Sequence, residues 1–302
     1  MHVLVFGSTG QVARELARAE WTAGTALTFL GREAADFSRP GMLGAVLLAH
    51  RSDIVIIAAA YTAVDKAEDD EATAITINAD APAAIAAAAA ALSIPVVHLS
   101  TDYVFDGSKD GCYAEGDAVA PINAYGRSKL AGEIAVRKEN PRHLILRTSW
   151  LYSAHGANFL RTMLRLAATC ESVSIVADQQ GCPTSAPDLA RAIAAACPRL
   201  LAADAPWGTY HLASASATTW HGFAEAIFAE LAGRGLRRPR NDAIATIDHP
   251  TRAKRPLNSR LCSERFADMF GLRLPGFETA VPSVLSEALD AASPAETAKE
   301  LQ

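Results

Sequence analysis

The sequence lacks the charge excess that would suit a nucleic-acid-binding protein. Its 28 Lys and Arg residues are outnumbered by 33 Asp and Glu residues, which gives a formal net charge of −5 over 302 residues. A chain without a basic excess has no electrostatic footprint for a nucleic acid. We therefore expect no nucleic-acid partner, and a polyanionic small molecule would need a local group of Arg or Lys side chains.

Cysteine is scarce, and its spacing is irregular. The five cysteines are Cys112, Cys170, Cys182, Cys197 and Cys262, with no C-x-x-C pair among them. An odd number at scattered positions argues against a disulfide framework and against a zinc site. We therefore predict reduced thiols in a cytoplasmic protein that holds no metal.

Long hydrophobic runs are also missing. The apolar start, MHVLVF, ends at Gly7, which is too early for a secretory signal. The most apolar window, residues 81–92, is mostly alanine and too short to span a bilayer. We therefore expect no membrane partner, and we expect a closely packed, buried helix over this window.

The composition that is present is globular, with 50% hydrophobic and 20% charged residues. In the first half, short apolar runs alternate with helical patterns, and continuous apolar runs are typical of strands buried on both faces of a parallel sheet. Strands are expected at 2–6, 26–30, 53–59, 95–100 and 143–149, and helices at 10–20, 41–50, 73–92 and 124–138. This alternation predicts an α/β fold with a Rossmann-like, doubly wound parallel sheet.

The second half is less regular. Strands are expected at 172–178 and 209–213, helices at 186–201 and 218–233, a loop over 234–262, and a frayed tail from about residue 291. We predict an NAD(P)-binding domain over residues 1–152. A smaller α+β, mainly substrate-binding region would follow over 153–302, with a part at about 184–213 returning to the sheet.

A glycine-rich turn follows the first expected strand. In VFGSTGQVARELARA, Gly7 and Gly10 open a helix, and Ala13 is a small residue where that helix would pack on the sheet. Glycines allow a tight turn, and the helix N-terminus offers free N–H groups and a positive dipole end to a pyrophosphate. A purely structural turn would carry the same glycines, but the place ahead of a β-α-β pattern favours dinucleotide binding.

The end of the second strand bears on the choice of cofactor. An acidic residue there would bind a ribose 2′-hydroxyl, whereas an arginine suits a 2′-phosphate. The sequence has Arg32 at this point, with Glu33 beside it. We predict NADPH as the cofactor, with NADH possible. Three alanines, residues 58–60, end the third strand and would let a cofactor lie close, although helix packing would also favour them.

The stretch NAYGRSKLAGE sets Tyr125 four residues ahead of Lys129, on the same face of the expected helix. A nearby ammonium favours the phenolate and lowers the pKa of a tyrosine, which makes the phenol a usable acid or base near neutrality. The strand in HLSTDYVFDG ends with Ser100, Thr101 and Asp102. Ligands of open α/β sheets bind beyond the carboxyl ends of strands, so a hydroxyl there would lie near the tyrosine.

In this order, the motifs resemble those of the extended short-chain dehydrogenase/reductases. The matching segments run from residue 3 to about 262: VFGSTGQVA, AAAYTAVDKAE, STDYVFDG, PINAYGRSKLAGE, LRTSWLY, NFLRTMLRLA, DQQGCPTSAPDLA, GTYHLA, TTWHGFAEAIF and RPLNSRL. The likeness is strongest to members that act on nucleotide sugars. It implies NAD(P)H-dependent reduction of a dTDP-linked 4-keto-6-deoxyhexose.

The resemblance gives catalytic roles to Thr101, Tyr125 and Lys129. Together with the residues argued above, the predicted cofactor site is Gly7, Thr9, Gly10, Gln11, Val12, Arg32, Asp36, Phe37, Ala58, Ala59, Ala60, Tyr61, Ser100, Tyr125 and Lys129. The predicted substrate site is Val64, Thr101, Asp102, Tyr103, Trp150, Arg255 and Asn258. Plain core packing is the alternative for the two aromatic residues of the substrate site, Tyr103 and Trp150.

Two further features follow from the same resemblance. The basic cluster RAKRP, residues 252–256, would bind the substrate diphosphate, or else form a solvated loop. Some relatives bind Mg²⁺ at a dimer interface, and Glu15 resembles one ligand, but Pro187 stands at the place of another. We therefore predict no metal and leave a monomer or a homodimer open.

Two other functions remain open from the sequence. One is a related epimerase, dehydratase or other 4-keto reductase. Dehydratases need further acid/base residues, and STDYVF offers Asp102 with no Glu after it, which favours a simple reductase. The other is a non-catalytic, NADP-binding regulatory subunit, against which the joint presence of Thr101, Tyr125 and Lys129 argues.

Overall fold

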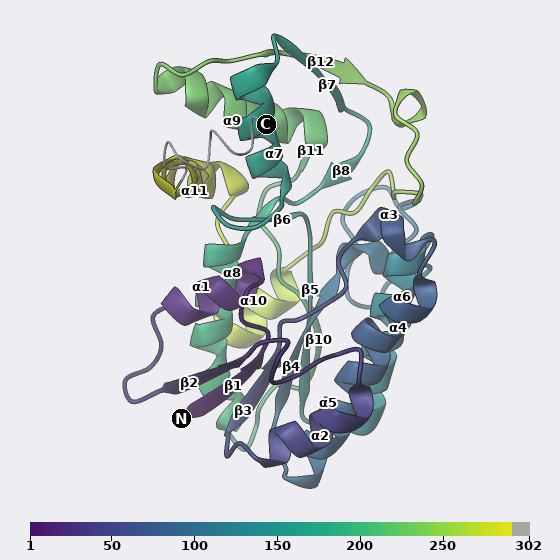
Figure 1. Cartoon of the computed structure of the whole chain (residues 1–302), viewed down its shortest axis with the longest axis vertical. Coiled ribbons are helices and arrows are strands. Elements are labelled where there is room, and N and C mark those ends of the chain that lie inside the picture. The colour runs from purple at the N-terminus through teal and green to yellow at the C-terminus, as the bar shows by residue number, and fades with distance from the viewer. Residues whose placement is uncertain (292–302) are drawn as a thin grey trace.

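A six-stranded, wholly parallel sheet forms the centre of the fold in a computed structural model that describes residues 1–291 (Figure 1). The strand order is β10-β5-β4-β3-β1-β2, and every neighbouring pair is parallel. The strands are β1 (His2–Phe6), β2 (Ala26–Leu30), β3 (Ile54–Ile57), β4 (Val96–Thr101), β5 (His143–Thr148) and β10 (Gly208–His211). The predicted doubly wound α/β fold is confirmed.

Helices cover both faces of this sheet (Figure 1). One face carries α1 (Gln11–Arg18), α8 (Ala186–Ala196) and α10 (Glu264–Phe270), and the other carries α2 (Pro40–Leu48), α5 (Ala81–Ala91) and α6 (Ala124–Glu139). Successive strand residues point to opposite faces, so Val3 and Val5 join the first core and Leu4 and Phe6 the second. Strands buried on both faces explain the continuous apolar runs of the sequence.

The direction of winding changes at β1. The chain first adds β2 on one side of β1 and then places β3 on the other side. The carboxyl ends of β1 and β3 therefore flank the topological switch point, where open α/β sheets bind their ligands. Gly7 follows β1 there, and Ala58 follows β3.

The helix expected at 73–92 is interrupted. It consists of α4 (Glu71–Ile75), a π-helical turn, η1 (Thr76–Asp80), and α5. In the π-turn, the buried Asn78 amide donates to the carbonyl of Tyr61 and to Ser128 Oγ, at 3.0 and 2.9 Å. Of the described helices, the run Glu71–Ala91 alone is long and apolar enough to cross a membrane by length and composition. Its buried alanines pack against the sheet.

A smaller region stands beyond the carboxyl edge of the sheet (Figure 1). Its core is formed by α7 (Phe159–Thr169), α9 (Trp220–Gly233) and α11 (Phe277–Ala291). Its strands pair as β6 (Leu151–Tyr152) with β9 (Thr184–Ser185), β8 (Gln180–Gly181) with β11 (Thr218–Thr219), and β7 (Ser172–Val176) with β12 (Arg240–Ile244). The remaining short elements are α3 (Val64–Ala67), η2 (Asp102–Val104), η3 (Cys197–Leu201) and η4 (Thr246–Asp248).

The second half departs from the sequence prediction in one strand and three helices. Strand β12 lies inside the predicted loop, and helices α7, α10 and α11 were not predicted from periodicity. The predicted return to the sheet is present, since β10 pairs with β5. The division into two domains near residue 152 stays a prediction. The predicted frayed tail falls almost wholly on residues 292–302, outside the described residues.

The prediction of reduced thiols is wrong for two cysteines. Cys112 and Cys262 form a disulfide across 150 residues of sequence, with their Cα atoms 5.4 Å apart. The flanking residues Tyr113 and Leu261 pair as an isolated bridge, which brings the two segments together. The spacing of the cysteines along the sequence does not indicate such a long-range pairing. Cys170, Cys182 and Cys197 are free.

Candidate active site

The glycine turn is shaped to admit a ligand at the switch point. Gly7 has φ +121°, and a Cβ there would lie 3.1 Å from the backbone nitrogen of Ala59. The N–H groups of Ala58 and Ala59 both donate to the carbonyl of Phe6, at 2.9 Å each. Gly10 caps α1 without a side-chain hydrogen bond, so the first N–H groups of the helix are left for an anion. This cradle fits a dinucleotide pyrophosphate.

Three neighbouring predicted residues differ in what they contribute. Thr9 is exposed at the turn, whereas Val12 is buried in the core and serves packing. Gln11 Oε1 accepts hydrogen bonds from Ser153 Oγ and Asn158 Nδ2, both at 3.0 Å. Gln11 therefore ties the turn to the loop that leads into the smaller region.

The end of β2 presents a cation at the place expected for a 2′-phosphate. The Arg32 side chain is 85% exposed, and its Nε lies 3.8 Å from the Asp36 carboxylate. Hydrogen bonds from Ser38 hold the pKa of Asp36 below its usual value. Phe37 is buried against Phe6, with ring centroids 6.1 Å apart. The sequence-predicted residues of this corner thus include one solvent-facing guanidinium and one core side chain.

The start of α6 places Tyr125 beside Thr101. Asn123 caps the helix by accepting from Gly126 N at 2.7 Å, and its Nδ2 donates to the carbonyl of Lys254 at 2.8 Å. A Cβ at Gly126 would overlap the carbonyl of Tyr103, so glycine lets the helix lie against η2. The Thr101 hydroxyl is then close enough to the Tyr125 phenol to lower its pKa.

The two members of the Tyr–Lys pair lie in different surroundings. Burial raises the pKa of Tyr125 to about 12, against the opposing effect of the hydrogen bond with Thr101. Lys129 is 3% exposed, and its Nζ donates to the carbonyl of Leu99 at 2.6 Å. Burial lowers the pKa of Lys129 to about 8, and Glu133 opposes this. The sequence argument expected the ammonium to lower the pKa of the phenol, but burial dominates, so the phenol keeps its proton at neutral pH.

Asp102 is buried under the site and orients Thr101. Its Oδ1 accepts from Thr101 Oγ1 at 3.0 Å, and its Oδ2 accepts from Ser149 Oγ at 2.9 Å. Burial raises the pKa of Asp102 to about 6, while hydrogen bonds from Ser259, Ser149 and Thr101 lower it. Asp102 is only 3% exposed, so a substrate could hardly contact it. Its geometry supports a role in holding the catalytic hydroxyl of Thr101.

A buried ion pair under α6 was missed by sequence reasoning. Arg147 donates to both carboxylate oxygens of Glu133, at 2.8 and 2.7 Å. Ser100 Oγ donates to the same carboxylate at 2.6 Å. Ser100 was predicted to contact the cofactor, but this bond turns its hydroxyl into the interior. The available signal was Glu133 itself, which follows Lys129 by four residues and so shares its helix face.

Trp150 follows β5 in a conformation that is rare for a bulky residue. Its φ is +47°, and its ring stacks on Trp220 with centroids 3.5 Å apart and planes within 5°. Gly181 packs so closely that a Cβ there would overlap the indole. Strained backbone held by its surroundings often marks a binding site. The half-buried ring fits both the predicted sugar pocket and the packing alternative.

The predicted basic cluster is paired with two aspartates in and just after α3. Arg255 binds both carboxylate oxygens of Asp65, at 3.0 and 2.6 Å, and hydrogen-bonds the hydroxyl of Tyr103. Arg252 forms an ion pair with Asp69. These pairs bring the cluster next to the half-buried Val64 and Tyr103, but they neutralise part of its charge.

Two aromatic residues and one amide complete the predicted substrate side. The ring of Tyr103 meets that of Tyr125 edge-on, with centroids 6.0 Å apart. Asn258 is 7% exposed, and its Nδ2 donates to the carbonyls of Lys109 and Gly111, both at 2.6 Å. The Asn258 amide thus holds the loop that contains Lys109 and Gly111. Its geometry supports a role in positioning this loop.

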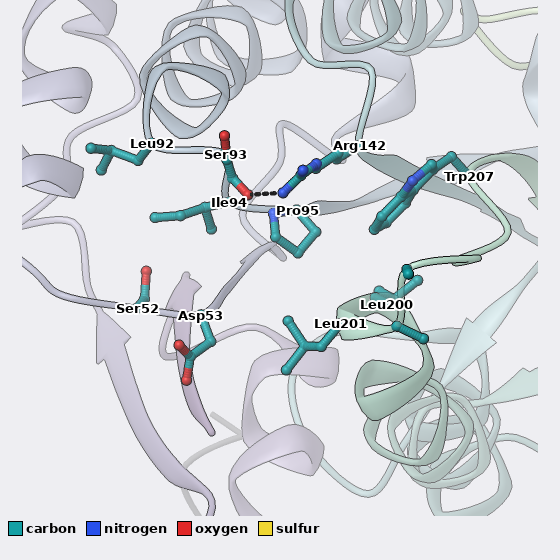
Figure 2. Close-up of a pocket in the computed structure, with 12 residues that line it drawn as sticks. Ser52, Asp53, Leu92, Ser93, Ile94, Pro95, Arg142, Leu200, Leu201 and Trp207 are labelled. Atoms are coloured by element: carbon teal, nitrogen blue, oxygen red, sulfur yellow. Dashed lines mark hydrogen bonds between the residues drawn. The ribbon is translucent and has the colours of Figure 1, made fainter.

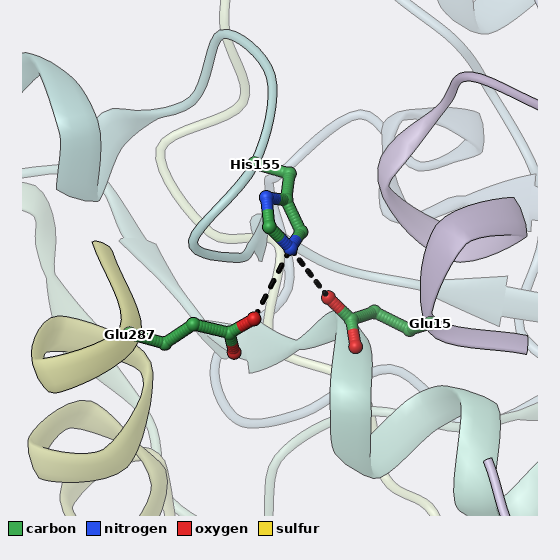
Figure 3. Close-up of side chains that lie close together, drawn as sticks. All are labelled: Glu15, His155 and Glu287. Atoms are coloured by element: carbon green, nitrogen blue, oxygen red, sulfur yellow. Dashed lines mark ion pairs between the residues drawn. The ribbon is translucent and has the colours of Figure 1, made fainter. Parts of the chain in front are cut away.

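A cluster of two carboxylates and an imidazole joins α1 to α11 (Figure 3). Candidate ligand atoms of Glu15, His155 and Glu287 all lie within 4.8 Å of one another. Arg18 Nη1 donates to Glu287 and lies 3.1 Å from His155 Nε2, so a guanidinium already supplies positive charge there. Sequence reasoning singled out Glu15 but not the other two. The expectation that no metal is bound stays a prediction.

A cavity of about 390 Å³ lies at the opposite edge of the sheet (Figure 2). Its lining includes Asp53, Pro95, Arg142 and Trp207, which precede β3, β4, β5 and β10. The cavity is therefore at the amino ends of the strands. None of the predicted site residues lines it. Ligands in this architecture bind at the carboxyl ends, so the glycine turn, Thr101 and Tyr125 mark the candidate active site.

Comparisons with known proteins agree on one family. A family model described as the RmlD substrate binding domain matches residues 1–289. The dTDP-4-dehydrorhamnose reductase of Salmonella typhimurium is 44% identical over 292 residues, covering 95% of this chain and 98% of that protein. The one from Sinorhizobium fredii is 42% identical over 283 residues, covering 92% and 94%.

Solved structures show the same likeness. The dTDP-4-dehydrorhamnose reductase of Clostridium acetobutylicum has a TM-score of 0.88 at 32% identity, covering 95% of this chain and 99% of that one. The enzyme from Bacillus anthracis, solved in complex with NADP, has a TM-score of 0.86 at 32% identity, with the same coverage. This chain therefore belongs to the RmlD family, that of the dTDP-4-dehydrorhamnose reductases.

Proposed function

We propose that this protein reduces dTDP-4-dehydro-β-L-rhamnose to dTDP-L-rhamnose with NADPH, as a step of dTDP-rhamnose biosynthesis in the cytoplasm. The observation that carries the proposal is that Thr101, the last residue of β4, and Tyr125, in the first turn of α6, both lie at the carboxyl edge of the sheet. We infer the substrate from the names of the relatives, and the class of cofactor from the complex of the Bacillus anthracis enzyme with NADP.

The chain's own residues fit a nicotinamide dinucleotide. The close backbone approach at Gly7 and the uncapped start of α1 suit the pyrophosphate, and the exposed Arg32 suits a 2′-phosphate. The alanines after β3, residues 58–60, are half-exposed and leave room beside the turn. When bound, the reduced cofactor supplies the hydride for the sugar carbonyl carbon.

Thr101 and Tyr125 act on the carbonyl oxygen of the substrate. With substrate bound, the Tyr125 hydroxyl donates to that oxygen and the Thr101 hydroxyl turns its proton from Asp102 toward it, which orients the carbonyl for attack. As negative charge develops on the oxygen, Tyr125 donates its proton to it and the alcohol forms. Lys129, on the same helix face, would contribute positive charge that stabilises the phenolate that remains. Asp102 fixes the Thr101 hydroxyl through the hydrogen bond between the two side chains.

The remaining predicted contacts surround the sugar and its diphosphate. Tyr103 and Trp150 are half-buried and would shape the sugar pocket. Arg255 would meet the diphosphate, with Asp65 setting its direction. Val64 lies at the start of α3, next to this ion pair. Because Asn258 holds the neighbouring loop, its effect on the substrate would be indirect.

A substrate panel tests the proposal against its alternatives. The protein would be given dTDP-4-dehydro-β-L-rhamnose, the same sugar on UDP, and the 4-keto-D-sugar nucleotide, each with NADPH. We expect stoichiometric loss of reduced-cofactor absorbance and dTDP-L-rhamnose as the product by NMR. Turnover of a different sugar or nucleotide would favour another 4-keto reductase. Tight NADPH binding without turnover of any of these substrates would favour a non-catalytic subunit.

A further inference from the structure

The Cys112–Cys262 disulfide clamps a segment that reaches three parts of the candidate active site. We call residues 252–262 the clamp segment. Arg255 of this segment binds Asp65 and lies beside Tyr103. Ser259, whose hydroxyl donates to the carbonyl of Gln180, lies close enough to Asp102 to lower the pKa of its carboxyl. The backbone carbonyl of Lys254 accepts from Asn123, the cap of the helix that carries Tyr125 and Lys129. The position of the clamp segment therefore affects the substrate side of the site.

Apart from the disulfide, the clamp segment is held by the ion pairs of Arg252 and Arg255 at one end and by hydrogen bonds to distant parts of the chain at the other. Tyr113 N donates to the carbonyl of Arg260 at 2.7 Å, and Cys262 N donates to the carbonyl of Tyr113 at 2.8 Å. No helix or named strand includes residues 252–262. The disulfide adds a covalent restraint across 150 residues of sequence at the carboxyl end of the segment, where the backbone pairs with the neighbouring chain only through the isolated Tyr113–Leu261 bridge.

The disulfide is accessible from solvent. Cys112 is exposed and Cys262 is half-exposed, and both line a cavity of about 260 Å³. Arg260 and Arg273 also line the cavity. Glu264, at 3.5 Å from Arg273, offsets one of these two charges, so the lining stays net positive. A small thiol that carries carboxylates matches this cavity in size and in charge.

We propose that Cys112–Cys262 is a thiol–disulfide exchange site for a small carboxylate-bearing thiol, and that its reduction releases the clamp segment and weakens binding of the nucleotide sugar. The effect on the sugar rests on the proposed function. The exchange itself does not.

The reaction balances as a two-electron exchange. A thiolate attacks Sγ of Cys112, the more exposed sulfur, and the S–S bond breaks as Cys262 leaves as a thiolate. A second thiolate then attacks the mixed disulfide and releases the small-molecule disulfide, leaving Cys112 as a thiolate. Two thiols are oxidised, the protein disulfide is reduced, and the two protons from the thiols end on the cysteines.

The test compares the oxidised and the glutathione-reduced protein. Alkylation and mass spectrometry would locate the new thiols, and hydrogen exchange would follow residues 252–262. We expect faster exchange there after reduction and a KM for the nucleotide sugar raised about fivefold or more, with the KM for NADPH nearly unchanged. The double variant Cys112→Ser/Cys262→Ser should behave like the reduced protein, and Cys170→Ser should behave like the oxidised one.

A second experiment tests the preference for a thiol that carries carboxylates. Glutathione should reduce the disulfide faster than the aminothiol cysteamine, and Arg273→Ala should narrow that difference. Equal rates for the two thiols would overturn the carboxylate preference. Unchanged hydrogen exchange and an unchanged sugar KM after complete reduction of the wild-type protein would overturn the clamp. If neither redox state oxidises NADPH, the proposed function fails, while hydrogen exchange still decides whether reduction frees the segment.

Discussion

At the scale of single residues, the chemistry depends on a phenol that holds its proton. Burial raises the pKa of Tyr125 to about 12, so the group is an acid in its protonated form across the neutral range. The neighbouring Thr101 hydroxyl opposes this rise in pKa, and Asp102 accepts a hydrogen bond from Thr101. The proton donor and the carbonyl-orienting hydroxyl are thus neighbours.

Removing the phenolic hydroxyl should stop most turnover. In Tyr125→Phe, we expect kcat to fall by about 100-fold or more because the developing alkoxide loses its proton donor. The affinity for NADPH, measured by fluorescence quenching, should change little. The matched control is Tyr210→Phe. Tyr210 lies on β10, and its hydroxyl donates to the carbonyl of Pro206. Equal kcat for Tyr125→Phe and wild type would refute the acid role.

The raised pKa of Asp102 predicts how the free energy of unfolding depends on pH. Burial raises its pKa to about 6, from an ordinary 3.8, so the folded protein binds this proton more tightly than the unfolded chain does. Its contribution to stability is complete below about pH 4 and is lost as the pH rises to 6, a change of about 3 kcal/mol. In Asp102→Asn, whose side chain does not titrate, this loss of stability between pH 4 and 6 should be absent.

Urea denaturation at pH 4, 5, 6 and 7 would measure the effect. The free energy of unfolding of Asp102→Asn should rise relative to wild type between pH 4 and 6. The control is Asp110→Asn, an exposed aspartate in the same part of the chain, which should follow the wild-type curve. Parallel curves for wild type and Asp102→Asn would contradict the raised pKa.

Sequence reasoning found some of these residues and missed others for a physical reason. The spacing of Tyr125 and Lys129 is local, and a helix fixes which residues share a face. The pairing of Ser100 and Arg147 with Glu133 depends on the register between β4 and β5, which sets Ser100 opposite Arg147. That register is a property of the assembled sheet, so it could not be read from either strand alone.

At the scale of elements, the start of α6 links the helix to the clamp segment. Asn123→Ala removes the cap bond to Gly126 and the bond to the carbonyl of Lys254. We expect about 1–2 kcal/mol of lost stability and a raised KM for the nucleotide sugar. Ser185→Ala, which uncaps α8 on one face of the sheet, should lose similar stability with unchanged KM. Thermal melts and steady-state kinetics would separate the two effects.

The end of β2 should set the cofactor preference. Arg32→Ala removes the exposed guanidinium, so we expect the KM for NADPH to rise about tenfold while that for NADH hardly changes. The exposed Arg39 offers a control, since Arg39→Ala removes a charge at the start of α2. A wild-type enzyme that already prefers NADH would count against the role of Arg32.

Strands with a continuous apolar run could be predicted, and a strand without such a run could not. Strands β1 to β5 lie within a few residues of the expected apolar runs. Strand β12, with the sequence RNDAI, has no apolar run, and it exists because β7 offers a parallel partner. Periodicity did not reveal the π-turn at Thr76–Asp80, where Asn78 bonds both backbone groups of Tyr61.

At the scale of the whole molecule, one core is assembled from distant parts of the chain. Leu189, Ile193, Tyr210, Phe266 and Leu274 pack in the same cluster as Val3, Leu16 and Leu144. We therefore expect a fragment of residues 1–152 to expose much of one sheet face and to aggregate. Expression of this fragment, compared with the full chain by solubility and circular dichroism, would check this. A soluble fragment with a cooperative melt would contradict it.

The late return of β10 and α10 to the sheet also has a consequence for how the protein is made. During synthesis, residues 1–201 can emerge and wind most of the sheet, but its β5 edge stays open until β10 arrives. The apolar face nearby waits longer still, for Phe266 and Leu274. A nascent chain in this state offers both an unpaired strand and bare hydrophobic surface, so this is the interval in which a chaperone would be needed most.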